Sequence, residues 1–166
     1  GVNPAFLGSA GLLRGIKRSL NEGGIRVPLI VRWTGKTKPN TVSELPVAFW
    51  DLMPTVAQAA RSRAPRDIDG ISFLPTLQSL PQTQQHEFLY WEFHEGGSQQ
   101  AARMGDWKAI RPELGKALEL YNLKTDIGET KNVAAQNPDV VIKFENFLRT
   151  ARTRSTHWPI TKRANR

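Results

Sequence analysis

Residues 12–28 of the chain read Leu12-Leu13-Arg14-Gly15-Ile16-Lys17-Arg18-Ser19-Leu20-Asn21-Glu22-Gly23-Gly24-Ile25-Arg26-Val27-Pro28. This stretch carries four basic side chains and runs into a strongly apolar segment over residues 25–33. The segment is nearly continuous and rich in branched residues, which predicts a strand buried on both faces, starting after Pro28 or lying at a sheet edge. Loops at strand ends often bind ligands in open α/β sheets, so the cations either hold an anionic group or form a solvated basic loop.

The rest of the first half alternates loops with short elements. Residues 34–46 predict a loop, and Asp51 is typical of the N-cap of a helix over residues 52–61. The apolar face expected for this helix consists of Leu52, Met53, Val56 and Ala60. Residues 71–80 form a short apolar piece, and the Gln-rich residues 81–86 predict a linker between two subdomains.

The second half has a different pattern, with short apolar runs separated by turn signals. Residues 87–93, 100–104, 107–111 and 117–122 each predict a short strand. Asn137 followed by Pro138 is typical of a helix start. The apolar residues that recur at helical spacing after it are Val140, Val141, Phe144, Phe147, Leu148 and Ala151. The pattern therefore predicts an antiparallel meander covered by one helix.

Composition limits the chemistry of the chain. It contains no cysteine, which excludes a disulfide, a thiolate zinc site and a cysteine nucleophile within these residues. No apolar run approaches the roughly 20 residues of a membrane span. The net charge of +8 comes mainly from residues 149–166, which hold six basic side chains and no acidic one. This run is typical of a solvated tail, with binding to nucleic acid or to a polyanionic glycan as alternatives.

The three histidines show no metal-ligand spacing. His94 differs from His86 and His157, because Glu92, Glu95 and a Gly-Gly pair flank it on a predicted loop at a strand end. Loops of this kind often line pockets, although an ordinary hairpin turn has the same composition.

Several motifs together resemble one known family. The stretch from Lys17 to Pro28 resembles the second conserved signature of the type I sulfatases, the arylsulfatase and N-acetylgalactosamine-6-sulfatase group. Further resemblances follow in family order over about residues 11 to 150. They are Trp33-Thr34-Gly35-Lys36, Asp51-Leu52-Met53-Pro54-Thr55, Asp69-Gly70-Ile71-Ser72-Phe73-Leu74-Pro75, Arg103-Met104-Gly105-Asp106-Trp107-Lys108, Glu119-Leu120-Tyr121-Asn122-Leu123 and Asp126-Ile127-Gly128-Glu129-Thr130-Lys131-Asn132. Thr34 departs from the usual Trp-Pro-Gly.

The resemblance implies an α/β, alkaline-phosphatase-like fold and a chain that is its C-terminal part. Residues 1–80 would be the edge of the large α/β domain, residues 87–151 a four-stranded antiparallel sheet packed by a C-terminal helix, and residues 152–166 a basic tail. The implied activity of the intact protein is hydrolysis of sulfate esters of carbohydrates or aryl compounds. The alternatives are a non-catalytic glycan- or partner-binding module, and a phosphonate or phosphodiester hydrolase on the same fold.

The resemblance also assigns expected roles to a few residues. Lys17 matches the lysine that contacts the sulfate group, while His94 and Gln99 lie on the loop expected near the mouth of the active site. The family's formylglycine and its calcium or magnesium ion are expected in a missing N-terminal part, so this chain alone is expected to hold no cofactor and to be inactive.

The expected partners are a sulfated carbohydrate or aryl sulfate, and either the missing N-terminal part or an oligomer mate. Nucleic acid and a membrane span are not expected, and the expected location is periplasmic or secreted. The remaining signature residues have structural expectations. Glu22 should pair with Arg26 or bind backbone, Trp107 should pack under the C-terminal helix, and Asp126, Glu129 and Asn132 should order the turn before it.

Overall fold

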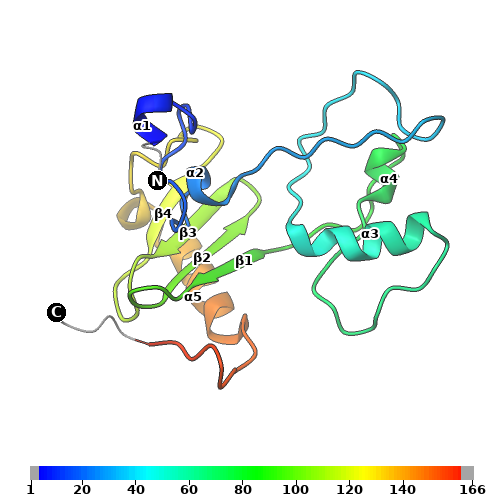
Figure 1. The fold of residues 1–166 in the computed structure, drawn as a ribbon. Coiled ribbons are helices and arrows are strands. Elements are labelled where there is room, and N and C mark those ends of the chain that lie inside the picture. Colours follow the sequence, from blue (N-terminus) through cyan, green and yellow to red (C-terminus); the bar gives the residue numbers. More distant parts are fainter. Residues whose placement is uncertain (1–3, 162–166) are drawn as a thin grey trace. The chain divides into compact units, whose positions relative to one another are not determined.

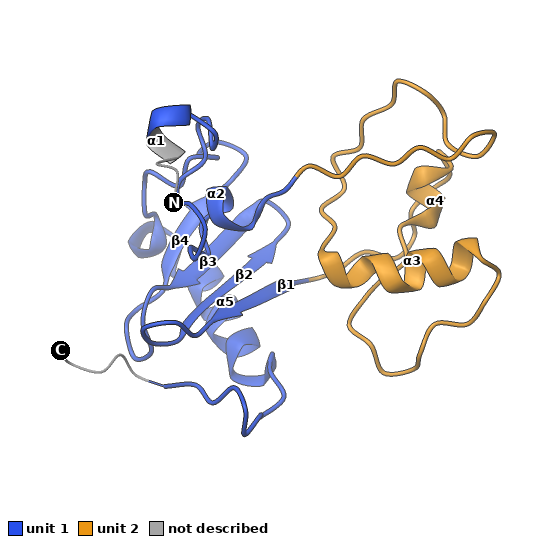
Figure 2. Ribbon diagram, viewed as in Figure 1, with its two compact units in different colours: residues 1–27, 88–166 blue, residues 28–87 orange. Residues whose placement is uncertain are grey.

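The computed structural model describes residues 4–161. The chain divides into two compact units (Figure 2). Unit 1 joins the N-terminal segment, up to Val27, to everything from Phe88 onward, and unit 2 consists of residues Pro28–Glu87. The expected division of the parent protein into residues 1–80, 87–151 and 152–166 stays a prediction.

Unit 1 is built on a four-stranded antiparallel sheet (Figure 1). Its strands follow one another in the order of the sequence, and α5 and the short 3-10 helix η2 come after them. The elements are β1 (Leu89–Phe93), β2 (Gln99–Met104), β3 (Trp107–Arg111), β4 (Glu119–Asn122), η2 (Ala134–Gln136) and α5 (Pro138–Thr150). The predicted meander and its covering helix are therefore confirmed.

Neighbouring residues of a strand point to opposite sides of the sheet, so the sheet has two faces. Other parts of unit 1 cover both of them. On one face Ala102, Ala109 and Leu120 pack against Phe144 and Leu148 of α5. Trp107 is partly buried against the same cluster, as predicted.

The opposite face of the sheet is covered by the N-terminal segment. Ala101, Ile110 and Tyr121 pack there against Leu20, with Ile25 partly buried beside them. Ile25 ends the short helix α2 (Glu22–Ile25), which lies over the sheet in Figure 1. The segment also contains α1 (Pro4–Leu7). Because Leu20 and Ile25 pack on this second face, the basic stretch around Lys17 lies against the sheet.

Unit 2 contains the 3-10 helix η1 (Phe49–Asp51), α3 (Leu52–Ala59) and α4 (Leu74–Leu77). The predicted helix after Asp51 is confirmed. The carboxylate of Asp51 accepts hydrogen bonds from the backbone N–H of Ala48 and Ile71, both at 2.8 Å, and Nε2 of His86 lies 2.8 Å away. Thr55 accepts from the N–H of Phe73 at 3.0 Å. Two of the motifs thus bind each other through buried polar side chains.

Two expectations for the first half were wrong. Within the described residues, 26–48 contain no strand, and Val27 and Ile30 are 76% and 90% exposed. A strand needs neighbouring backbone to complete its hydrogen bonds, and this segment pairs with none in the described part of the chain. The expected apolar face of α3 is also open to solvent, since Met53 and Val56 are 57% and 63% exposed. The helix buries Pro54 and Thr55 instead.

None of the helices among residues 4–161 has the length and apolar character needed to cross a membrane.

Candidate functional site

Lys17 lies in a tight turn of unit 1, formed by residues 16–19 and called the Lys17 turn below. The N–H of Ser19 donates to the carbonyl of Ile16 at 2.9 Å, and Arg18 adopts a positive φ of 77°. Lys17 is exposed at this turn. Its ammonium is therefore available to an anion, while its backbone is fixed by the turn.

Two glycines allow the chain to fold back under the Lys17 turn. A Cβ at Gly24 would lie 2.1 Å from the carbonyl oxygen of Ser19, and one at Gly23 would lie 2.5 Å from that of Gly15. The N–H of Gly23 donates to the carbonyl of Arg14 at 2.7 Å. The Gly-Gly pair, which lies within α2, therefore serves close backbone packing.

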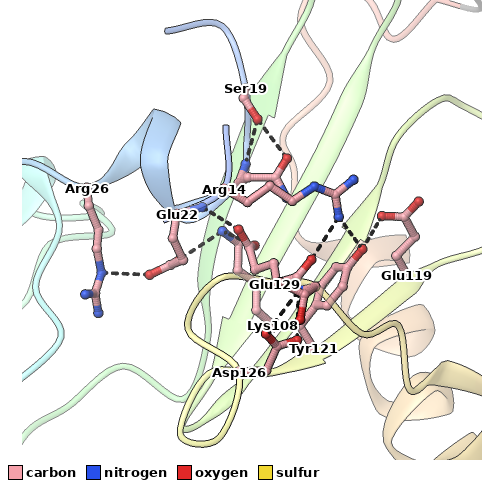
Figure 3. A network of polar contacts seen from close by, with 11 residues as sticks. Arg14, Ser19, Glu22, Arg26, Lys108, Glu119, Tyr121, Asp126 and Glu129 are labelled. Atoms are coloured by element: carbon pink, nitrogen blue, oxygen red, sulfur yellow. Dashed lines mark hydrogen bonds and ion pairs between the residues drawn. The ribbon is translucent and has the colours of Figure 1, made fainter. Parts of the chain in front are cut away.

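A buried charge cluster anchors this backbone to the sheet (Figure 3). Nζ of Lys108, on β3, lies 2.8 Å from Oε1 of Glu22 and 3.0 Å from Oε1 of Glu129. The second contact is an ion pair without hydrogen-bond geometry. Oε2 of Glu129 accepts from the N–H of Glu22 at 2.8 Å. All three side chains are 0–2% exposed, so each charge depends on the others for compensation.

A second contact holds the start of the same stretch. The guanidinium of Arg14 donates to the hydroxyl of Tyr121 at 2.9 Å and to the carbonyl of Glu129 at 3.0 Å. The hydroxyl of Tyr121 donates to Oε2 of Glu119 at 2.6 Å. Burial, and then the hydrogen bond to Glu119, raise the pKa of Tyr121 to about 12, so the phenol remains a neutral donor.

The structure joins the Lys17 turn to the loop of residues 94–98, called the His94 loop. Nε of Arg18 lies 2.8 Å from Oε2 of Glu95. Both side chains are more than half exposed, so this ion pair adds little stability, but it shows that the two segments are neighbours. Neither residue was singled out as a site residue in the sequence, because nothing in the pattern pairs positions so far apart.

The ring of His94 is fixed by contacts on both nitrogens. Nδ1 lies 3.0 Å from Oγ of Ser98, and Nε2 lies 3.3 Å from Oε2 of Glu92. The ring also lies 6.0 Å, centroid to centroid, from Trp158. Gln99 is half-buried at the start of β2, where it pairs with Phe93. The contact that joins the His94 loop to the Lys17 turn is therefore made by Arg18 and Glu95, while His94 is turned to Glu92, Ser98 and Trp158.

The signature residues have the structural roles expected, with one exception. Arg26 pairs with Glu22 at 2.8 Å, and the Asp126 carboxylate accepts from the N–H groups of Thr130 and Lys131. The Asn132 side chain accepts from the N–H groups of Leu120 and Ala134.

The exception is Glu129, which binds Glu22 and Lys108 instead of ordering its own turn. A lysine inside the apolar strand Trp107–Arg111 was the available signal, because a buried ammonium requires carboxylate partners.

A metal ion does not fit the described residues. Among residues 4–161, no group of three or more His, Cys, Asp or Glu side chains could hold one. The buried carboxylates of Glu22 and Glu129 are already compensated by Lys108. No step of the chemistry is therefore assigned to a metal held by this part of the chain.

Comparison with known proteins identifies the family. The profile described as N-sulphoglucosamine sulphohydrolase, C-terminal, matches residues 15–153. N-acetylgalactosamine-6-O-sulfatase of Bacteroides thetaiotaomicron is 31% identical over 160 residues, covering 87% of this chain and 30% of that protein. The chain spans less than a third of the length of the curated relatives it matches.

Solved structures agree on the fold. The structure of Ps i-CgsB in complex with k-i-k-neocarrahexaose superposes with a TM-score of 0.74 at 27% identity, covering 84% of this chain and 31% of that one. Phosphonate monoester hydrolase of Agrobacterium radiobacter shares the fold alone, with a TM-score of 0.53 at 19% identity over 74% of this chain and 30% of that one. The alkaline-phosphatase-like fold class is thus confirmed, and the chain belongs to the sulfatase family as a C-terminal portion of it.

Proposed function

We propose that this chain is the part of a sulfatase that contributes one cation to the sulfate-binding site and a loop to substrate recognition. The complete protein would hydrolyse sulfate esters of carbohydrates or aryl compounds. The observation that carries the proposal is the Lys17 turn, whose backbone is anchored by a buried charge cluster while its lysine is exposed beside the His94 loop.

In this proposal Lys17 pairs with a sulfate oxygen. A lysine ammonium is a compact charge that can follow the oxygen on which negative charge increases as the ester bond breaks. The fixed backbone around Lys17 lowers the cost of placing that charge before the substrate arrives. The nucleophile, a formylglycine, and its calcium or magnesium ion would come from sequence outside these 166 residues.

His94 and Gln99 are proposed to contact the sugar. Imidazole and amide groups are suited to hydrogen bonds with sugar hydroxyls. Because both ring nitrogens of His94 already have partners, its contact with the sugar would replace one of these two contacts. A sulfated carbohydrate is favoured over an aryl sulfate as the natural substrate, because a relative that matches most of this chain is an N-acetylgalactosamine-6-O-sulfatase. A periplasmic or secreted location belongs to the same proposal.

The test uses the complete protein and two substrates, a sulfated sugar and a small aryl sulfate. His94→Ala should lower kcat/KM for the sugar by roughly tenfold, the loss of about one hydrogen bond to a polar partner, and scarcely affect the aryl sulfate. His157→Ala, at an exposed histidine, serves as the control. Equal losses on both substrates would remove the recognition role, and no sulfate release from any sulfate ester would remove the proposed activity.

A further inference from the structure

Unit 1 contains a cavity of about 510 Å³ lined by residues from β2, β3, α5 and the segment that follows α5. Four arginines line it, together with polar Gln100 and Ser155. The arginines are Arg111, Arg149, Arg152 and Arg154. We call it the arginine cavity; the residues of the Lys17 turn are not part of its lining.

Two of these arginines are held in place by the fold. Arg111 donates to Oε1 of Gln100 at 2.8 Å and to Oε2 of Glu145 at 2.6 Å. Arg152 donates to Oε1 of Glu92 at 2.7 Å and to the carbonyl of Trp158 at 2.8 Å. Their side chains are 14% and 16% exposed, so these guanidinium groups are positioned before any ligand arrives.

The other two arginines have no carboxylate partner among the described residues. Arg149 donates to the side-chain oxygen of Asn146, and both Arg149 and Arg154 are exposed. The lining therefore holds four guanidinium groups, of which only Arg111 and Arg152 are neutralised by ion pairs. An excess of positive charge therefore remains among the residues that line the cavity.

We propose that the arginine cavity is an accessory binding site for a sulfated saccharide. The planar fork of a guanidinium group matches the oxygens of a sulfate group and can bind two of them at once. Gln100 and Ser155 offer hydrogen bonds to hydroxyl groups, and the apolar side chains of Pro159 and Ile160 offer a surface for the C–H face of a ring. The cavity volume lies within the roughly 300–1,000 Å³ of typical small-ligand sites. This site binds and does not react.

The experiment is calorimetric titration of the chain with a sulfated disaccharide and with the same disaccharide without sulfate. The double variant Arg149→Gln/Arg154→Gln is compared with Arg63→Gln/Arg66→Gln, which removes two exposed arginines of unit 2 and changes the net charge equally. We expect the sulfated disaccharide to bind and the first variant to weaken it at least about tenfold, because two charge-assisted hydrogen bonds are lost. The second variant should leave the affinity unchanged.

Equal binding of the unsulfated disaccharide would overturn the inference. Equal losses in the two double variants, or no binding by the unmodified chain, would also overturn it. Lys17→Ala separates this site from the proposed sulfate-binding residue, since it removes only binding at the Lys17 turn and should leave the binding step of the arginine cavity in place. If Lys17→Ala alone abolished binding, the saccharide would be bound at the Lys17 turn and the arginine cavity would have no such role.

Discussion

The side chain of Lys108 joins the N-terminal segment of unit 1 to the loop that follows its sheet. Its ammonium lies between Glu22, which belongs to the segment carrying Lys17, and Glu129, which follows the sheet. All three groups are removed from water, so their charges are favourable only as a set. Arg26 adds a second cation to Glu22 at the edge of the cluster.

Replacing Lys108 with methionine should therefore destabilise unit 1 strongly. Glu129 would lose its ion pair and Glu22 one of its two, and breaking a buried pair in this way costs about 3–5 kcal/mol. Urea unfolding followed by circular dichroism measures the effect, and Lys116→Met, at an exposed lysine, is the control. A loss no larger than that of the control would show that the cluster does not hold the N-terminal segment.

Contacts between individual side chains could be predicted from the sequence only where the two residues are close in the chain. The pairing of Glu22 with Arg26 spans four positions and was predicted, as were the bonds of Asp126 and Asn132 within their own turns. The contact of Glu22 with Glu129 joins positions 107 apart, and no spacing rule connects them. The roles of Lys17, His94 and Gln99 in substrate binding stay predictions.

At the scale of elements, β1 is tied to the segment after α5 by one acidic side chain. Oε1 of Glu92 accepts from the hydroxyl of Tyr90 and from Nε of Arg152 at 2.7 Å. Burial alone would raise the pKa of Glu92, but the hydrogen bonds from Tyr90 and Arg152 outweigh it and lower the pKa below its usual 4.5. The folded state therefore binds the proton of Glu92 less tightly than the unfolded state does.

This lowered pKa predicts a pH dependence of the free energy of unfolding. The contribution of Glu92 is fully present above 4.5 and is lost as the pH falls through the lower pKa of the folded state. Glu92→Gln should cost about 1.5 kcal/mol at neutral pH, and the difference from the unmodified chain should shrink below pH 4.5. Urea titrations across that range give the difference, with Glu44→Gln at an exposed position as the control. A difference independent of pH would contradict the assignment.

The elements of the second half were predictable because their signals were local. Short apolar runs, the turn signals between them and the Asn-Pro helix start give β1 to β4 and α5 from short stretches of sequence. The strand expected at residues 25–33 was wrong because an apolar run becomes a strand only where another strand completes its hydrogen bonds. For α3, the apolar stripe was real but faces solvent, since Pro54 and Thr55 make the contact with residues 69–74.

At the scale of the whole molecule, unit 2 exposes many large apolar side chains. Ile30, Val42 and Phe49 are 82–90% exposed. Met53 and Val56 of α3 are 57% and 63% exposed. Monomeric proteins rarely leave such side chains uncovered in quantity. In a sulfatase of which this chain is a portion, we expect further sequence to cover them.

The isolated 166-residue chain should therefore bind a hydrophobic dye or self-associate. Met53→Ser/Val56→Ser should reduce both effects, because it removes two exposed apolar side chains without touching a buried contact. Dye fluorescence and light scattering report these properties. A monodisperse monomer that binds no dye would show that the exposed side chains cover one another in solution, contrary to this expectation.

Lys17 is proposed to be presented by its anchored turn to the sulfate group of a substrate. The most direct measurement is steady-state hydrolysis of a chromogenic aryl sulfate by the complete protein, by its Lys17→Ala variant and by the Lys36→Ala control, at an exposed lysine of unit 2. We predict that Lys17→Ala lowers kcat by about 100-fold or more, the typical effect of losing one group that stabilises developing charge, with unchanged stability. Lys36→Ala should keep full activity, and the isolated chain should show none. A Lys17→Ala enzyme as active as Lys36→Ala would contradict the claim.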